Sequence, residues 1–115
     1  MGDDIATLNC WIPLSDCGTG YSVHGLDVIP VPLKHLFSKG SGVLDWTISA
    51  QAITDKYGES AIVTPTFRKG DAFFFDQFLM HRSQYLADSS ESRYAIENWF
   101  FDSKYFPKNQ VPLKW

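Results

Sequence analysis

Two apolar runs joined by a polar loop constrain the fold of this chain more than any other feature. The first run, residues 72–83, follows the tight turn Lys69-Gly70-Asp71, and His81 stands near its end. The second run, residues 93–101, opens with Arg93. Apolar runs of this length, bounded by turn residues, predict β-strands. If these strands pair, they bring together a histidine and an arginine, which can bind a metal ion and a carboxylate.

The composition is that of a packed domain rich in β structure. Hydrophobic residues make up 44% of the 115 residues and aromatic residues 16%, which suits a single domain over residues 1–115. The net charge of −3 and the lack of a Lys/Arg run argue against a nucleic-acid partner. No apolar run approaches the roughly 18 residues that span a membrane, and the acidic start is no signal peptide. We therefore expect a cytoplasmic protein with free thiols at Cys10 and Cys17.

The periodicity of the whole chain predicts short strands and one helix. Ser49 as N-cap and Gly58 as the C′ residue bound the helix at residues 49–57. Strands are expected at residues 5–14, 26–29, 44–47, 61–64, 72–75, 78–83 and 93–101, with a loop at 15–20. About seven short strands with one short helix predict an all-β fold, a mostly antiparallel sandwich or barrel.

The first expected strand mixes polar and aromatic residues on one face. Alternation places Thr7, Asn9 and Trp11 together on that face. Such a mixture can line a cavity, which makes Asn9 and Trp11 candidate lining residues. It also occurs on an edge strand or a half-exposed face, and the sequence alone favours that second interpretation.

The two main candidate residues each have a structural and a functional interpretation. His81 is either a hydrogen-bonded core histidine or a ligand for a divalent metal. Arg93 lies on an otherwise apolar strand face and needs an anion, because an unpaired buried charge is costly. Glu97, two residues along the same face, is an internal candidate for that anion. The other candidate is a ligand carboxylate bound in bidentate fashion.

The other histidines are weaker candidates. His24 and Asp27 have the spacing His-x-x-Asp rather than His-x-Asp, which would set them on opposite faces of a strand. His24 is better explained as a loop residue. A cupin-like metal site built from His24, His35 and His81 is compatible with their separations, but no other feature of the sequence supports it.

Gly70-Asp71, the apolar strand, His81 and an arginine twelve residues later form an ordered set of motifs. This set resembles the C-terminal half of the phytanoyl-CoA dioxygenase-like family of iron(II)/2-oxoglutarate oxygenases. The resemblance also extends over residues 10–14, 16–18, 25–30, 93–97 and 110–113, so it covers nearly the whole chain. It implies a double-stranded β-helix (a jelly-roll barrel), Fe(II) and 2-oxoglutarate as cofactors, and hydroxylation of a small organic substrate.

Carried over by position, the resemblance gives His81 the role of the distal histidine in a 2-His-1-carboxylate triad. It gives Arg93 the role of the arginine that binds the far carboxylate of 2-oxoglutarate. The family's His-x-Asp pair precedes the strand that residues 10–14 resemble, and no His-x-Asp or His-x-Glu occurs in the 115 residues. The chain is therefore a fragment of such an enzyme, a homologue that has lost the chemistry, or a chain that takes iron ligands from another chain. We favour the fragment, with an incomplete jelly roll and no activity alone.

Two further expectations follow from the missing half. Strands without their usual neighbours would be exposed, which predicts a homo-oligomer formed through those strands. The alternative to an oxygenase fragment is a non-catalytic jelly-roll domain that binds a small ligand or associates with itself.

Overall fold

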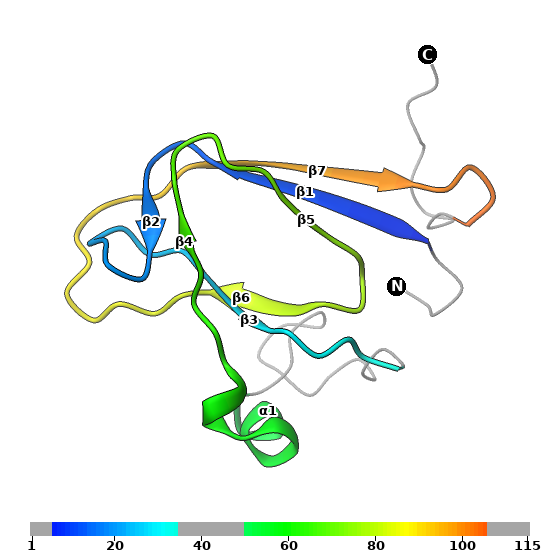
Figure 1. Ribbon diagram of the computed structural model, residues 1–115, viewed down its shortest axis with the longest axis horizontal. Coiled ribbons are helices and arrows are strands. Elements are labelled where there is room, and N and C mark those ends of the chain that lie inside the picture. The colour runs from blue at the N-terminus through cyan, green and yellow to red at the C-terminus, as the bar shows by residue number, and fades with distance from the viewer. Residues whose placement is uncertain (1–5, 35–49, 106–115) are drawn as a thin grey trace.

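The computed structural model describes residues 6–34 and 50–105, which form a mainly β structure with one α-helix (Figure 1). This confirms the predicted mainly β class for the described part of the chain. In chain order the elements are β1 (Thr7–Pro13), β2 (Cys17–Gly18), β3 (Leu26–Ile29), α1 (Ala50–Tyr57), the 3-10 helix η1 (Glu59–Ala61), β4 (Thr66–Phe67), β5 (Phe73–Phe75), β6 (Met80–Ser83) and β7 (Ala95–Phe101).

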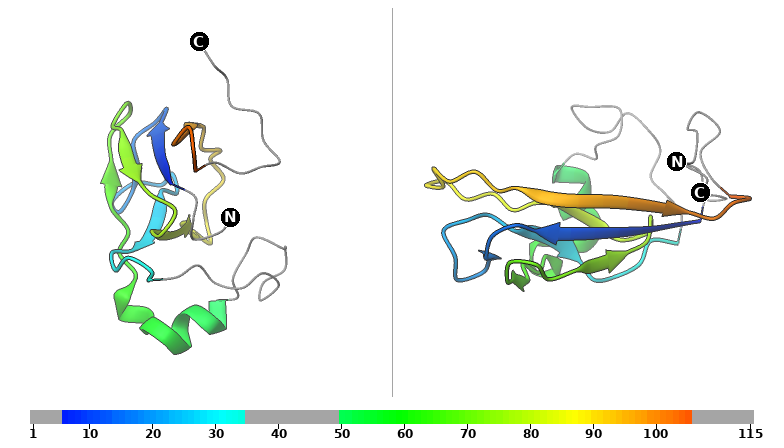
Figure 2. Two further views of the ribbon diagram at one scale, coloured as in Figure 1. Left: turned by 90° about the vertical axis from the view of Figure 1, so that its right-hand side faces the viewer. Right: turned by 90° about the horizontal axis from the view of Figure 1, so that it is seen from above.

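The strands form three small antiparallel sheets. One has the order β5-β1-β7, the second pairs β2 with β4, and the third pairs β3 with β6. Figures 1 and 2 show the three-stranded sheet lying opposite the β3–β6 pair, with the β2–β4 pair at one end. Along the chain, β1, β5 and β7 alternate with β3 and β6, so the longer strands cross between two layers.

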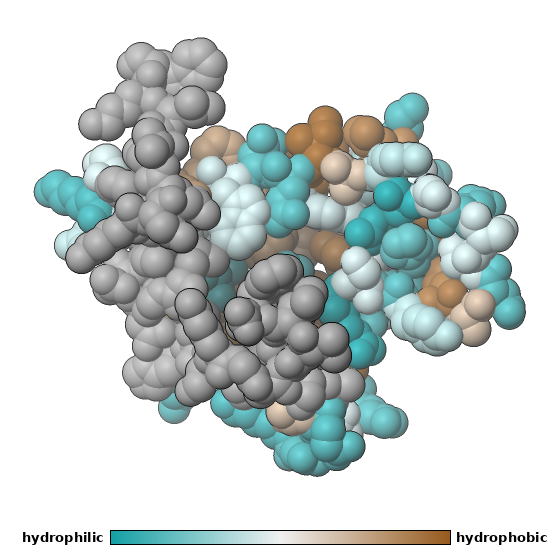
Figure 3. Space-filling model, turned by 180° about the vertical axis from the view of Figure 1, so that it is seen from behind, coloured by the Kyte–Doolittle hydropathy of each residue, from teal (hydrophilic) through white to brown (hydrophobic). Residues whose placement is uncertain are grey.

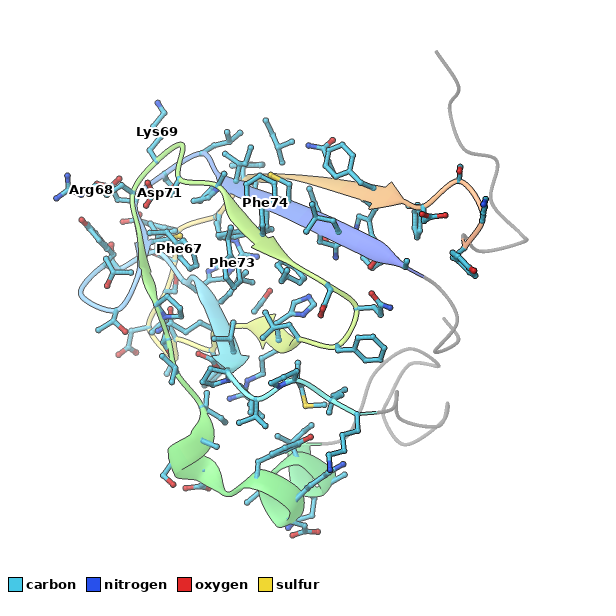
Figure 4. All side chains as sticks on the ribbon, turned by 45° about the vertical axis from the view of Figure 1, so that its right-hand side comes forward. Phe67, Arg68, Lys69, Asp71, Phe73 and Phe74 are labelled. Carbon is cyan, nitrogen blue, oxygen red and sulfur yellow. The ribbon has the colours of Figure 1, made fainter. Side chains whose placement is uncertain are left out.

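The core fills the space between these layers. Its buried cluster contains Trp11, Cys17, Val23, Leu26, Val28, Phe67 and Phe75. The rings of Trp11 and Phe67 meet edge to face, with centroids 5.1 Å apart, and Phe73 packs against Phe67 at 5.6 Å. Figure 4 shows Phe67 and Phe73 inside, whereas Arg68 and Lys69 point away at the turn that follows β4. Each large apolar side chain buried in this way contributes roughly 1.5–3 kcal/mol, so the aromatic cluster holds the two layers together.

The structure corrects the preferred interpretation of the first strand. β1 is not an edge strand but the central strand of its sheet, with β5 and β7 on its two sides. Asn9 and Trp11 are therefore only 1% and 4% exposed. Local alternation could not reveal this, because the strands that cover β1 come from residues 73–75 and 95–101, far along the chain.

The helix matches its prediction, and the segment after it does not. α1 ends at Tyr57, and Gly58 follows in the left-handed region with φ 76°, as expected for a C′ residue. The strand predicted at residues 61–64 is wrong, because the chain there first turns through η1 and then makes a single bridge between Val63 and Val28. Pro65 follows directly and has no N–H to extend a ladder. Residues 44–47, Ser49 and the tail after Tyr105 lie outside the described residues.

A two-residue strand replaces the loop expected at residues 17–18. β2 pairs with β4, and Gly18 has φ 95°, a conformation that favours glycine. A Cβ added at Gly18 would overlap the carbonyl oxygen of Pro65. The β2–β4 contact thus depends on the absence of a side chain at this position.

Other strand boundaries shift by one or two residues from those predicted. β5 begins at Phe73, β6 at Met80 and β7 at Ala95. The late start of β6 has a local cause, since Asp76 caps a turn by accepting a hydrogen bond from the Phe78 N–H at 2.9 Å.

Substituting Gly18 by alanine is expected to lower the free energy of unfolding by about 3 kcal/mol. The left-handed backbone accounts for roughly 1 kcal/mol and the overlap with Pro65 for the rest. Urea denaturation of the original chain and of Gly18→Ala measures the difference in the free energy of unfolding.

Gly20→Ala is the matched control, because Gly20 also has a positive φ of 90° but nothing lies within 4 Å of an added Cβ. Gly20→Ala should lower the free energy of unfolding only by the roughly 1 kcal/mol that the left-handed backbone costs. Equal losses at the two positions would show that the close approach of β2 to β4 is unimportant.

Candidate functional site

Arg93 is the best-placed polar residue of the interior. It lies two residues before β7, and its guanidinium reaches between the layers. Nη1 donates to the carbonyl oxygen of Gly25 at 2.6 Å and to that of His24 at 3.4 Å, and Nη2 donates to Ser83 Oγ at 3.2 Å. The guanidinium carbon lies 5.1 Å from the centre of the Trp11 ring, a cation–π distance. One side chain therefore joins β7 to β1, β6 and the segment before β3.

The anion predicted within the chain is not present. Glu97 accepts a hydrogen bond from Trp99 Nε1 at 3.0 Å, and among the described residues no carboxylate bonds to Arg93. Of the two candidate anions for Arg93, Glu97 is therefore not its partner. A guanidinium has five N–H donors, of which the three hydrogen bonds occupy three, so two have no partner within the described residues.

Burial and charge act in opposite directions on Arg93 and Cys17. Burial lowers the pKa of Arg93, and the neighbouring Cys17 partly opposes this shift. Burial raises the pKa of Cys17, Arg93 lowers it, and Asp16 adds to the rise. The thiol therefore stays neutral at physiological pH and gives Arg93 no counter-ion. Cys10 and Cys17 are both free and buried, as expected.

His81 lies on β6 opposite Val28, with its ring against Phe75 at a centroid distance of 4.6 Å. Its Nδ1 is 3.1 Å from the carbonyl oxygen of Leu79. A carbonyl can only accept, so this contact requires a proton on Nδ1 and leaves the lone pair on Nε2. The side chain is solvent-exposed. His81 thus presents one imidazole nitrogen that could bind a metal ion.

The strands expected to bring His81 and Arg93 together do not pair. β6, which holds His81, pairs with β3, and β7, which follows Arg93, pairs with β1. Ser83 lies two residues after His81, about 7 Å along β6, and its Oγ accepts a hydrogen bond from Arg93 Nη2. Ser83 is thus the residue of β6 that contacts Arg93, whereas His81 is solvent-exposed.

Asn9 and Trp11 are both interior residues, as the cavity-lining prediction required. Trp11 belongs to the core cluster and also supports the Arg93 guanidinium. The Oδ1 atom of Asn9 is buried and has no hydrogen-bond partner among the described residues. An unpaired buried acceptor costs roughly 1–3 kcal/mol, so this atom marks a place where a donor would be stabilising.

An open pocket lies on the other side of the β3–β6 pair, next to α1. Its volume is about 510 Å³, and its walls hold the ion pair between Arg82 Nε and Asp27 Oδ2 at 2.9 Å. Its lining residues are Asp27, Ile53, Thr54, Glu59, Ile62, Thr64, Arg82, Gln84 and Tyr85. The predicted site residues His81, Arg93, Asn9 and Trp11 do not line this cavity.

The other metal hypotheses receive no support from the described residues. Asp27 is held by Arg82 and by Thr64 Oγ1 at 2.6 Å, whereas His24 offers its carbonyl to Arg93. In residues 6–34 and 50–105, no three histidine, cysteine, aspartate or glutamate side chains come close enough to share a metal ion. His35 of the cupin-like alternative lies outside these ranges.

The sequence did not identify three partners of Arg93, namely the carbonyls of His24 and Gly25 and the hydroxyl of Ser83. Backbone acceptors carry no residue signature, so only Ser83 could have been found, from its place two residues after His81 on the same strand face.

No protein-family model, no curated protein and no solved structure matches the chain. The described helix is too short to cross a membrane. The resemblance to oxygenases therefore rests on the motifs of the sequence, and the function remains a proposal.

The burial of Cys17 predicts a fall in stability at alkaline pH. An unfolded thiol ionises near its ordinary pKa of 9.0, whereas the folded thiol ionises at higher pH. The unfolded state therefore loses its proton first, and the free energy of unfolding should fall as the pH rises through 9.0 and up to the raised pKa.

Chemical denaturation between pH 7 and pH 11 checks this, with Cys17→Ala as control. The variant should show a shallower decline over this range, since it retains every other titrating group. An equal decline in the free energy of unfolding with pH for the original chain and for Cys17→Ala would contradict the prediction.

Proposed function

We propose that this chain supplies the cosubstrate anchor and one metal ligand of an iron(II)/2-oxoglutarate-dependent dioxygenase domain. Arg93 binds the far carboxylate of 2-oxoglutarate, and His81 is the distal histidine. The observation that carries the proposal is the interior guanidinium of Arg93, which has two N–H donors free and no carboxylate partner among the described residues. Residues 6–34 and 50–105 are proposed to be inactive by themselves, because they hold no group of three side chains that could bind the iron.

The arrangement of the layers supports a jelly roll of the double-stranded β-helix type. In that fold the chain winds so that successive strands fall in two facing sheets, with the site in the space between them. The alternation of β1, β5 and β7 with β3 and β6 follows this pattern. In the proposed site a ligand would bridge His81 on β6 and Arg93, which lies two residues before β7.

The residues around Arg93 fit a carboxylate. Its two remaining donors can bind a carboxylate without breaking the bonds to the carbonyls of His24 and Gly25. Ser83 Oγ accepts from Arg93, so its own proton is free to be donated to a ligand oxygen. Trp11 supports the flat face of the guanidinium and keeps water from it. These contacts preorganise the arginine, which lowers the entropy lost on binding.

The described residues do not fit catalytic iron. His81 offers Nε2, but no two further histidine, cysteine or carboxylate side chains lie beside it within the described ranges. Such a centre needs two histidines and a carboxylate. Iron held by such a triad, together with 2-oxoglutarate, would supply the O₂ activation needed to hydroxylate a small organic substrate. The proposal therefore assigns the other two ligands to residues outside the described part of the chain.

A non-catalytic role for the same domain is the second candidate. It is favoured by the bonds of Arg93, which suffice to explain the arginine as a structural link between β7, β6 and the segment before β3. In that case no ligand is needed, and the free donors face water. Whether the chain binds 2-oxoglutarate distinguishes the oxygenase role from the non-catalytic role.

Titration with 2-oxoglutarate should perturb the NMR signals of the Gly25 and Ser83 amides and of the Trp11 indole N–H. Arg93→Lys should weaken binding at least about tenfold, because lysine keeps the charge but loses the planar fork. 2-Oxobutyrate lacks the second carboxylate, so it should bind weakly, and with similar affinity, to the original chain and to Arg93→Lys.

Arg82→Lys is the matched control, since Arg82 is an arginine of β6 whose partner Asp27 lies on the outer side of the β3–β6 pair. It should leave binding within about twofold of the original chain. Equal affinity of the original and Arg93→Lys chains, with both folded by circular dichroism, would leave only the non-catalytic role.

A further inference from the structure

Among the residues that the structure describes, β7 is an edge strand with one side unpaired. Within the described residues it pairs with β1 alone. Leu14 N donates to Tyr94 O at 2.9 Å, and Asp102 N donates to Ala6 O at 3.1 Å. Because such bonds recur at every second residue of an antiparallel ladder, the even-numbered residues of β7 direct their backbone groups to β1. The unpaired N–H and C=O groups are those of Ala95, Glu97, Trp99 and Phe101.

An apolar surface lies next to this free edge, on the outer face of the three-stranded sheet. Its exposed members are Leu8, Phe74, Tyr94, Ile96 and Phe100, with exposures between 45% and 71%. Figure 3 shows apolar side chains gathered along the top of the molecule, where this sheet lies. At about 200 Å² per fully exposed large side chain, the patch offers on the order of 500 Å². Patches of this size on single proteins are typical of interaction sites.

We propose that the occupant of this edge is a second copy of the chain, with β7 paired antiparallel to β7 about a two-fold axis at Asn98. In this register Ala95 lies opposite Phe101 of the second copy, and Glu97 opposite Trp99. Both pairs join residues whose backbone groups point to the free edge, so all these groups become bonded. The two three-stranded sheets become one six-stranded sheet.

The sequence of β7 favours this register over its neighbours. A two-fold axis at Glu97 would set two carboxylates opposite each other, which is destabilising. An axis at Asn98 instead pairs the carboxamides with each other and Ile96 with Phe100, and it overlaps all seven residues of the strand. The apolar patches of the two copies then join across the axis. Pairing of the two edges brings Ile96, Asn98 and Phe100 against their counterparts, whereas Leu8 on β1 and Phe74 on β5 stay on the open face of the six-stranded sheet.

A disulfide across the axis tests the register. At the proposed Asn98 pair the Cα atoms would lie about 4.5 Å apart, within the range that a disulfide spans. Cys10 lies beside Asn98 on β1, so the experiment uses the full chain with Cys10→Ala. Adding Asn98→Cys should give a covalent dimer on mild oxidation, seen on a non-reducing gel.

Ile96→Cys in the same background is the matched control, because its two copies would be separated by about 14 Å. It should give at least about tenfold less covalent dimer. Equal cross-linking of the two variants, or none by Asn98→Cys, would overturn the proposed pairing.

Sedimentation of the unmodified chain tests the association itself. The original chain should sediment as a dimer, and Asn98→Lys should raise the dissociation constant at least about tenfold by placing two like charges face to face. Asn98→Ser, which adds no charge, should stay dimeric. A monomer at all concentrations would show that the surface is free or covered by another segment or protein, and would overturn the proposal. This result does not depend on 2-oxoglutarate binding.

Discussion

The structure depends on how one buried positive charge is satisfied. Arg93 is partly removed from water and has no carboxylate partner among the described residues, so backbone carbonyls, a hydroxyl and a ring face must stabilise it. These groups come from the segment before β3, from β6 and from β1. A single guanidinium therefore fixes the relative position of both layers, and the same contacts hold it ready for an anion.

The aromatic cluster and the contact of Gly18 with Pro65 compensate for the small size of the sheets. Two layers of only two and three strands expose much surface for the core that they enclose. The row of rings from Trp11 through Phe67 and Phe73 fills the space between the layers. The close approach of Gly18 to Pro65 lets the β2–β4 pair close one end of that space. Within residues 6–34 and 50–105, β5 and β7 are the two edge strands of the three-stranded sheet.

Local sequence patterns predicted which segments form helices and strands better than they predicted which strands pair. The helix before Gly58, the strand at residues 26–29 and the long strand at β7 follow from capping residues and alternation, which act over a few positions. The central place of β1 did not follow, because its neighbours are set by pairings across more than sixty residues. For the site, His81 and Arg93 were located as residues, but their supporting contacts are mostly backbone carbonyls, which any residue can provide.

The distance along the chain between Arg93 and its acceptors has a consequence for folding. The guanidinium bonds to carbonyls 68 and 69 residues away in sequence. Contacts of such high sequence separation form late, because the loop between them loses much conformational entropy before any bond is gained. The contacts of Arg93 are thus among the last features to assemble. An anion bound at the proposed site would require both layers to have docked, so it would stabilise the finished fold and none of the states that precede it.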